Sequence, residues 1–282
     1  METVQGIGEL REILDASDPG CSVGLVPTMG NLHAGHLSLM AASLDRCDLT
    51  VATIFVNPLQ FGPHEDLEGY PRTFAEDHAQ LEDAGVDLLF APHETEIYPE
   101  GRSAQTAVSV PGISTELCGA SRPGHFDGVT TVVLKLFNIA RPNVAFFGRK
   151  DYQQLTIIAN MTRHLNVPVE IVGVDTVRAD DGLALSSRNR YLDDAQRAVA
   201  PRLYATLQDT ADALRTGEND LPGLERTALG CLQAAGFEPD YVSIRDALTL
   251  AKPDPHARSL VILGAARLGR ARLIDNLCLE RT

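Results

Sequence analysis

The sequence predicts an α/β protein: a parallel sheet covered by helices, followed by a smaller α+β domain. Apolar, β-branched runs such as Leu49 to Val56 and Val167 to Val174 alternate with stretches of helical periodicity, which is typical of a buried parallel sheet. After about Val177 the pattern changes to helices followed by short strands. A chain of 282 residues exceeds the usual single domain, so we predict domains at 1–176 and 177–282.

Composition and charge restrict the possible partners. The chain has 24 Lys+Arg against 38 Asp+Glu, a formal charge of −14 that repels a nucleic-acid backbone, so no nucleic-acid partner is expected. The five cysteines are scattered and form no C-x-x-C pair, which fits reduced thiols in the cytosol. The start of the chain is acidic, and no apolar run is long enough to span a bilayer. We therefore expect a cytoplasmic protein without membrane contact.

The stretch from Val23 to Leu39, VGLVPTMGNLHAGHLSL, predicts a strand, a turn and a helix start. Before it, the first 18 residues predict an amphipathic helix. A helix N-terminus attracts phosphate, and His33 and His36 are spaced so that both imidazoles can face one side of the helix. We interpret the stretch as a nucleoside triphosphate site. Two alternatives are histidines that only cap the helix and, less favoured by the spacing, a zinc site.

Amides follow the next predicted strand. Asn57 and Gln60 come directly after Leu49 to Val56, where the carboxyl end of a parallel strand places side chains near a ligand. An amide there can bind a hydroxyl or carboxylate of a small substrate. Capping of a turn explains Asn57 easily, but it explains Gln60 less well.

A loop from Phe61 to Arg72 then leads to a helix that ends at Gly85, where Thr73 and Glu76 have the spacing of a capping box. Glu76 and Asp77 could help to hold Mg²⁺, although carboxylates are favoured in a first helical turn anyway. A strand at 86–90, an irregular excursion at 92–125 with an edge strand at 106–110, and a helix at 128–140 complete this part.

Two further segments carry groups suited to phosphate. The strand Val144 to Phe147 runs into GRKDYQQ, in which Lys150 can meet phosphate, Asp151 can cap a helix or bind a ribose hydroxyl, and Gln154 faces the same side. A tight turn at Asp181-Gly182 precedes LSSRNR, whose hydroxyls and guanidinium can bind phosphate oxygens. In both segments a plain helix start is the alternative. The remainder predicts helices at 193–215, bent near Pro201, and at 221–235, then strands around 241–244, 258–263 and 272–277.

The motifs PTMGNLHAGH, FGRKDYQQL and LALSSRNRYL, with FVNPLQF and GHFDGVTTVVLKLF between them, closely resemble the pantoate–β-alanine ligase family. The resemblance runs from about Val23 to Leu192. It implies a Rossmann-like domain of the HIGH-motif nucleotidyltransferase superfamily, a C-terminal α+β lid domain and a homodimer. It also implies ATP-dependent joining of pantoate and β-alanine through a pantoyl adenylate, with release of pyrophosphate and AMP and with Mg²⁺ as cofactor.

Carried over by position, the resemblance assigns site residues. His36, His33, Lys150 and Arg188 would be catalytic. Gln60 and Gln154 would bind substrate. ATP would be bound by Met29, Gly30, Asn31, Leu32, His33, Ala34, Gly35, His36, Gly148, Arg149, Lys150, Asp151, Val177, Leu185, Ser186, Ser187 and Arg188. The resemblance assigns no ligands to Mg²⁺. Arg149 stands where the family usually has an acidic residue, so it adds charge beside phosphate or forms a surface pair elsewhere.

Two other functions are compatible with an ATP site. A related nucleotidyltransferase acting on a phosphorylated substrate would bind ATP alike, but it should carry cations where Gln60 and Gln154 stand. A non-catalytic nucleotide sensor would keep the ATP groups and might lose the substrate amides, which this chain retains. The sequence contains no Walker A motif, which argues against a P-loop kinase.

Overall fold

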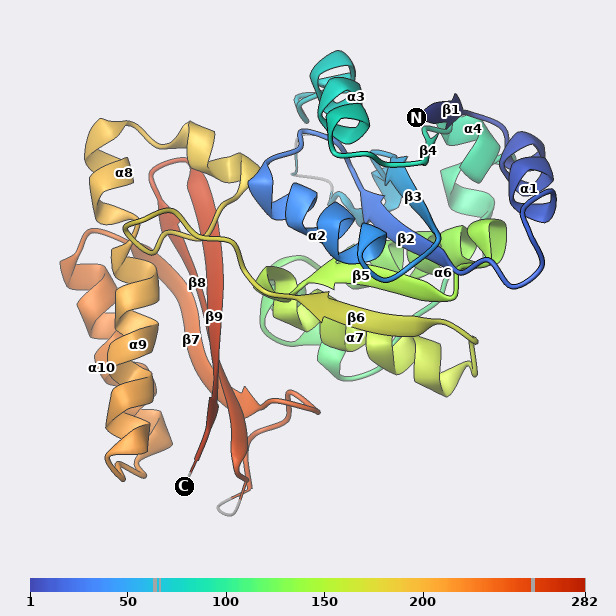
Figure 1. Ribbon diagram of the computed structural model, residues 1–282. Helices are drawn as coiled ribbons and strands as arrows, with labels where there is room; N and C mark the ends of the chain where they lie inside the picture. The colour runs from blue at the N-terminus through green and yellow to red at the C-terminus, as the bar shows by residue number, and fades with distance from the viewer. Residues whose placement is uncertain (63–64, 66, 255–256, 282) are drawn as a thin grey trace. The chain divides into compact units, whose positions relative to one another are not determined.

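A computed structural model describes residues 1–62, 65, 67–254 and 257–281 (Figure 1). Pro63, His64 and Asp66 of the predicted loop lie outside the described residues. The chain forms two compact units. The first unit comprises residues 1–149 and 157–175, and the second comprises 150–156 and 176–282. The second unit therefore takes in the residues around Lys150 as well as the C-terminal third of the chain. No helix within the described residues is long and apolar enough to cross a membrane.

The first unit is built on a parallel sheet of six strands in the order β1-β4-β3-β2-β5-β6. The strands are β1 (Glu2–Val4), β2 (Val23–Thr28), β3 (Leu49–Ile54), β4 (Leu88–Phe90), β5 (Val144–Gly148) and β6 (Glu170–Val174). From β2 the chain proceeds outward through β3 and β4 on one side, and through β5 and β6 on the other. The carboxyl ends of β2, β3 and β5 therefore flank the position where the strand order reverses, which is where open α/β sheets bind ligands.

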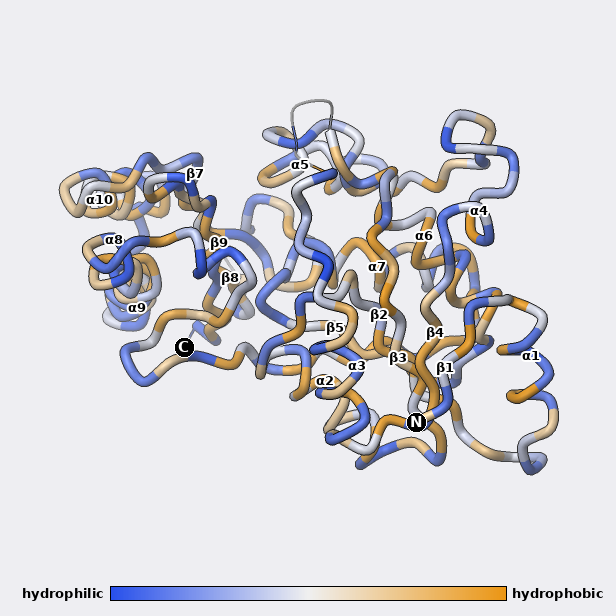
Figure 2. Tube along the Cα trace, turned by 90° about the horizontal axis from the view of Figure 1, so that it is seen from above, coloured by the Kyte–Doolittle hydropathy of each residue, from blue (hydrophilic) through white to orange (hydrophobic). Residues whose placement is uncertain are grey.

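Helices cover this sheet because its strands are apolar on both faces. Val26, Ala52 and Phe146 are buried, and Figure 2 shows hydrophobic residues along the central strands. The helices of the unit are α1 (Ile7–Asp15), α2 (Ala34–Leu44), α3 (Phe74–Asp83), α4 (Glu94–Ile97), α5 (Cys118–Ser121), α6 (His125–Ala140) and α7 (Tyr152–His164), whose first residues belong to the second unit. The turns η1 (Pro58–Gln60), η2 (Arg102–Ala104), η3 (Ile113–Thr115) and η4 (Arg149–Asp151) are 3₁₀ helices.

The second unit is an α+β structure. An antiparallel sheet is formed by β7 (Glu238–Asp246), β8 (Ser259–Leu268) and β9 (Ala271–Glu280), and it is preceded by η5 (Ser187–Tyr191), α8 (Asp194–Val199), α9 (Arg202–Arg215) and α10 (Leu221–Ala234). Its core joins Leu207 of α9 and Leu232 of α10 to Ile262 of β8. The helix predicted at 193–215 is thus two helices that separate around Pro201.

The α/β fold class with a small C-terminal α+β unit is confirmed, but three local predictions were wrong. Glu2–Val4 is a strand, not the start of the first helix. Residues 106–110 form no strand, because Thr130 Oγ1 donates to the Val108 carbonyl at 2.5 Å and Val108 N donates to Thr131 Oγ1 at 2.9 Å. These threonines satisfy backbone groups that a strand partner would otherwise satisfy. The third wrong prediction is the capping box at Thr73 and Glu76, because the Thr73 side chain makes no capping hydrogen bond at the start of α3.

Candidate active site

The loop between β2 and α2 is held by a buried carboxylate. Gly30 and Asn31 have positive φ angles of 77° and 54°. Asp77 of α3, only 1% exposed, accepts hydrogen bonds from Asn31 N and Leu32 N, each at 2.7 Å. A Cβ at position 30 would lie 2.9 Å from an Asp77 oxygen, so the close approach requires glycine. Asp77 thereby sets the shape of the segment that was predicted to bind ATP.

Thr73 also forms a hydrogen bond with the Asp77 carboxylate. Its hydroxyl donates to Asp77 Oδ2 at 3.1 Å, and it makes no side-chain cap at the start of α3. Both Asp77 oxygens therefore accept hydrogen bonds from protein donors. No group of three His, Cys, Asp or Glu residues within the described residues is arranged to hold a metal ion. We accordingly assign Asp77 to supporting the β2–α2 loop.

His33 and His36 cap the start of α2. His33 Nδ1 accepts from Gly35 N at 3.1 Å, and His36 Nδ1 accepts from His33 N at 3.3 Å. The ring centroids are 4.2 Å apart. Because both Nδ1 atoms accept an N–H, each neutral ring carries its proton on Nε2. The capping alternative is thus observed. An imidazole Nε2–H is a donor of the kind that binds phosphate oxygens.

Gln60 is held beside Met29 by buried polar groups. Its Nε2 lies 2.9 Å from Met29 Sδ, and its Oε1 accepts from Asn57 Nδ2 at 3.1 Å. Asn57 Nδ2 also donates to the Gly128 carbonyl, and Tyr98 Oη donates to Asn57 Oδ1 at 2.7 Å. Burial, with a smaller contribution from the nearby carboxylate of α4, raises the pKa of Tyr98, so its hydroxyl remains a donor. Asn57 therefore does more than cap η1.

The close approach of η1 to α6 depends on one glycine. A Cβ at position 128 would meet the Leu59 carbonyl oxygen at 2.3 Å. Only glycine permits the backbone contact that brings Asn57 within reach of α6. Gln60 thus takes its position from three separate segments of the first unit.

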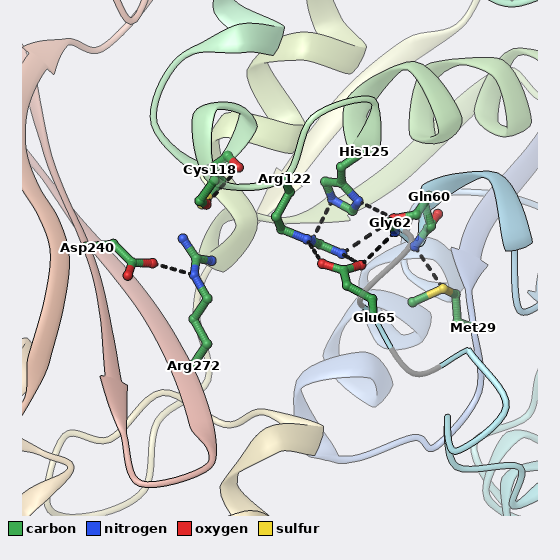
Figure 3. A network of polar contacts seen from close by, with 10 residues as sticks. Met29, Gln60, Gly62, Glu65, Cys118, Arg122, His125, Asp240 and Arg272 are labelled. Atoms are coloured by element: carbon green, nitrogen blue, oxygen red, sulfur yellow. Dashed lines mark hydrogen bonds and ion pairs between the residues drawn. The ribbon is translucent and has the colours of Figure 1, made fainter.

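A second network holds the main chain of Gln60 (Figure 3). His125 Nδ1 lies 2.8 Å from the Gln60 carbonyl oxygen, and His125 Nε2 lies 2.9 Å from Arg122 Nη1. Since Arg122 can only donate, Nε2 accepts, and the neutral His125 donates through Nδ1. Arg122 also forms a forked ion pair with Glu65 at 2.5 and 2.8 Å. Burial favours a higher pKa for Glu65, but hydrogen bonding and charge from Arg122 outweigh burial and lower it.

The Glu65–Arg122 pair should stabilise the fold in a pH-dependent way. A carboxyl group with a lowered pKa contributes stability above the pKa of the unfolded chain, and it loses that stability as pH falls through the lower folded pKa. The coupling free energy measured with Glu65→Gln, Arg122→Gln and the double variant should be full at about pH 7 and smaller at about pH 3. The cycle cancels the contribution of His125, which contacts Arg122.

Chemical denaturation at each pH measures this coupling. The exposed pair of Arg215 and Asp212 is the control, and it should couple weakly at every pH. A Glu65–Arg122 coupling that does not change between the two pH values would contradict the assignment.

The second unit contains a small pocket that carries cationic and polar side chains. It is lined by Lys150, Leu183, Ala184, Ser186, Arg188, Asn189, Leu203, Arg272, Leu273, Ile274 and Asp275. Asn189 Oδ1 is buried and has no hydrogen-bond partner within the described residues. A buried acceptor without a partner favours a ligand that brings a donor. Lys150, Ser186 and Arg188, predicted from two distant motifs, therefore lie around one pocket.

The other predicted residues of this region have local roles. Ser186 Oγ accepts from Arg188 N at 3.3 Å and caps η5, and Ser187 is the first residue of η5. Leu185 N donates to the Val177 carbonyl at 2.9 Å. Gln154 is half-buried in the first turn of α7.

At the end of β5, Gly148 leads into η4, which contains Arg149, Lys150 and Asp151. Lys150 Nζ lies 3.9 Å from Asp151 Oδ2. Arg149 donates to the Gly173 carbonyl at 3.1 Å and pairs with exposed Asp175 at 3.5 Å. Of the two possibilities for Arg149, the structure shows the surface pair.

Sequence reasoning missed several residues that support the site. Tyr98 and Arg122 carried no pattern of their own, and His125 lay in the GHFDGVTTVVLKLF motif without a role being assigned to it. Asp77 was considered only as a residue of a first helical turn that could help to hold Mg²⁺. Each acts on a residue distant in sequence, as in the 46 positions between Asn31 and Asp77. Only information on which distant positions of the sequence contact one another could have identified these residues.

A parallel sheet with a glycine-containing loop, two imidazoles and buried amides at its carboxyl edge defines an α/β enzyme of the nucleotide-using class. The family model for pantoate-beta-alanine ligase matches residues 2–278. Pantothenate synthetase of Pseudomonas savastanoi pv. phaseolicola is 55% identical, with 100% of each chain covered. That of Stutzerimonas stutzeri is 56% identical, over 99% of this chain and 98% of the relative. The chain belongs to the pantoate-beta-alanine ligase family and is an enzyme of that family.

Solved structures agree with this assignment. The crystal structure of pantothenate synthetase from Thermus thermophilus has a TM-score of 0.91 and 46% identity, covering 98% of this chain and 99% of the other. The pantoate-beta-alanine ligase from Francisella tularensis, complexed with beta-gamma ATP and beta-alanine, has a TM-score of 0.81 and 33% identity, covering 98% and 97%.

Proposed function

We propose that this enzyme condenses pantoate with β-alanine at the expense of ATP, through a pantoyl adenylate. In the first step a pantoate carboxylate oxygen attacks the α-phosphorus, the bond from that phosphorus to the bridging oxygen breaks, and pyrophosphate leaves. In the second step the β-alanine amine attacks the acyl carbon, the acyl–oxygen bond breaks, AMP leaves, and the amine loses a proton. Atoms and charge balance without a further reactant.

The observation that carries this proposal is the placement of Gln60. This amide is 9% exposed, and it is anchored on both its side chain and its main chain next to Met29 of the β2–α2 loop. A preorganised neutral amide suits a hydroxy acid, and a phosphorylated substrate would call for cations instead. We assign pantoate to Gln60 and Gln154, with β-alanine near Gln60.

ATP is assigned to the β2–α2 loop and to the segments 148–151, 177 and 185–188. Carboxylate attack at phosphorus needs little proton transfer, so charge neutralisation and positioning should supply most of the rate. His33 and His36 would donate through Nε2, and Lys150 and Arg188 would add positive charge. Of the residues assigned to ATP, Arg149 should contribute least to binding, because it pairs with Asp175.

Mg²⁺ would enter with the nucleotide. The described residues offer no cluster of three metal ligands, which fits an ion held mainly by phosphate oxygens and water. When bound, Mg²⁺ would neutralise charge on the departing pyrophosphate. We also propose that 177–282 act as a lid that protects the adenylate from water, and that the enzyme is a homodimer, which analytical ultracentrifugation can test.

Pyrophosphate release with Mg-ATP and pantoate, followed by AMP accumulation on adding β-alanine, tests the proposal. We expect continuous turnover only when all three substrates are present. Exchange of labelled pyrophosphate into ATP should require pantoate and should not require β-alanine, because the adenylate step is reversible. Nucleotide binding without pyrophosphate or AMP release would refute the ligase mechanism and favour a nucleotide sensor.

A further inference from the structure

We infer that Asp275 and Asn276 of β9 are positioning residues that set the two ATP-binding segments of the second unit in one geometry. The inference rests on the proposed function, because it concerns the pocket that carries Lys150, Ser186 and Arg188. Neither residue belongs to any of the motifs read from the sequence. Both are buried on the sheet beside that pocket, with exposures of 4% and 7%.

Asn276 holds the segment that contains Lys150. Its Nδ2 donates to the Lys150 carbonyl oxygen at 2.9 Å. Lys150 lies in η4, a short turn whose own hydrogen bonds do little to fix its direction. The bond from a buried strand therefore determines where the Lys150 side chain, 16% exposed, enters the pocket.

Asp275 holds the segment that leads to Ser186 and Arg188. Its two oxygens accept from Arg178 Nη1 and Nη2 at 2.6 and 2.9 Å. Arg178 also donates to the Gly182 carbonyl at 3.1 Å, and its guanidinium lies 3.5 Å from the ring centroid of Tyr204. A forked pair that also stacks on an aromatic ring has little freedom to rotate.

The position of Arg178 also fixes the positions of Ser186 and Arg188 in the pocket. Residues 177–185 form a short hairpin, in which Arg178 and Ala184 form a bridge and Leu185 N donates to the Val177 carbonyl. Both sides of this hairpin are therefore tied to Arg178. Ser186 is the residue that follows the hairpin, and it caps η5, which contains Arg188. A displacement of the hairpin would shift these groups together.

The two anchors are coupled within β9. Asp275 and Asn276 are adjacent, and Asp275 Oδ1 also accepts from Asn276 N at 2.8 Å. Asp275 thus links Arg178 to the main chain of the residue that holds Lys150. One dipeptide of a rigid strand determines the spacing between an ammonium and a serine–arginine pair that come from distant parts of the sequence. Such spacing matters because a misplacement of about 1 Å can cost on the order of 10²-fold in rate.

A double-mutant cycle separates positioning from a structural role. In the full-length enzyme, Asn276→Ala should weaken Mg-ATP binding about tenfold, measured by calorimetric titration without pantoate. In the Lys150→Ala background, Asn276→Ala should weaken Mg-ATP binding by less than about twofold, because the side chain that Asn276 positions is absent. Arg178→Lys, tested alone and with Arg188→Ala, provides an independent arm if Asn276→Ala folds poorly.

The matched control is Glu225→Gln in the same unit. Glu225 accepts from Ile244 N at 2.7 Å and from Ser243 Oγ at 3.3 Å, and it touches neither Lys150 nor the hairpin. Glu225→Gln should lower the Tm, while its affinity for ATP should stay within about twofold of that of the wild type. The inference is overturned if the Asn276 and Arg178 effects are the same in both backgrounds, or if neither changes ATP affinity. Failure of the wild-type enzyme to bind ATP would refute the proposed function instead.

Discussion

Replacing His36 with alanine is expected to lower the rate of pyrophosphate release by about 10²–10³-fold. Losing one preorganised donor to a developing charge typically costs that much. His36 Nδ1 accepts from His33 N, so the neutral ring presents its proton on Nε2. The same hydrogen bond caps α2, and its loss should reduce the free energy of unfolding by about 0.5–2 kcal/mol.

His36→Gln distinguishes these two roles. A glutamine at the third helical position can accept from the backbone N–H of the cap residue, so it should restore the stability that alanine loses. It supplies no imidazole, and the rate should remain low. Single-turnover pyrophosphate release with ATP and pantoate, together with thermal unfolding, gives both quantities. A His36→Gln enzyme with nearly wild-type rate would show that the ring serves only as a cap.

Replacing Asp77 with alanine should lower the free energy of unfolding by about 3–5 kcal/mol. Each hydrogen bond to a charged group contributes about 1.5–3 kcal/mol, and Asn31 N and Leu32 N would both lose their acceptor. The β2–α2 loop, with positive φ at Gly30 and Asn31, would lose its shape as well. The KM for ATP should therefore rise more than the KM for β-alanine.

Glu76→Ala is the matched control, because Glu76 is the exposed neighbour in the same helical turn. Its effect on stability should stay within about 0.5 kcal/mol. Denaturation in urea at several Mg²⁺ concentrations separates loop support from metal binding. If Asp77→Ala were as stable as the wild type and its activity were restored by excess Mg²⁺, Asp77 would act on the metal and the loop assignment would be wrong.

Local patterns were enough for most of the sheet. The runs that became β3 and β5 are largely apolar, because both faces of a parallel strand are buried and no alternation is needed. The same signal failed at residues 106–110, where the backbone N–H and carbonyl of Val108 are satisfied by threonines of α6 and not by a strand. It also failed at Glu2–Val4, which is too short to show a period and becomes a strand only by pairing with β4.

The sequence by itself determined the α/β class and the family resemblance, and it predicted phosphate binding at the β2–α2 turn, because each rests on short patterns that can be recognised locally. The tertiary structure decided which side chains support the site. Asp77 reaches Asn31, Tyr98 reaches Asn57, and Asn276 reaches Lys150 across as many as 126 positions. Such contacts leave no local period, since they arise only when the sheet brings distant loops together and buried polar groups must find partners.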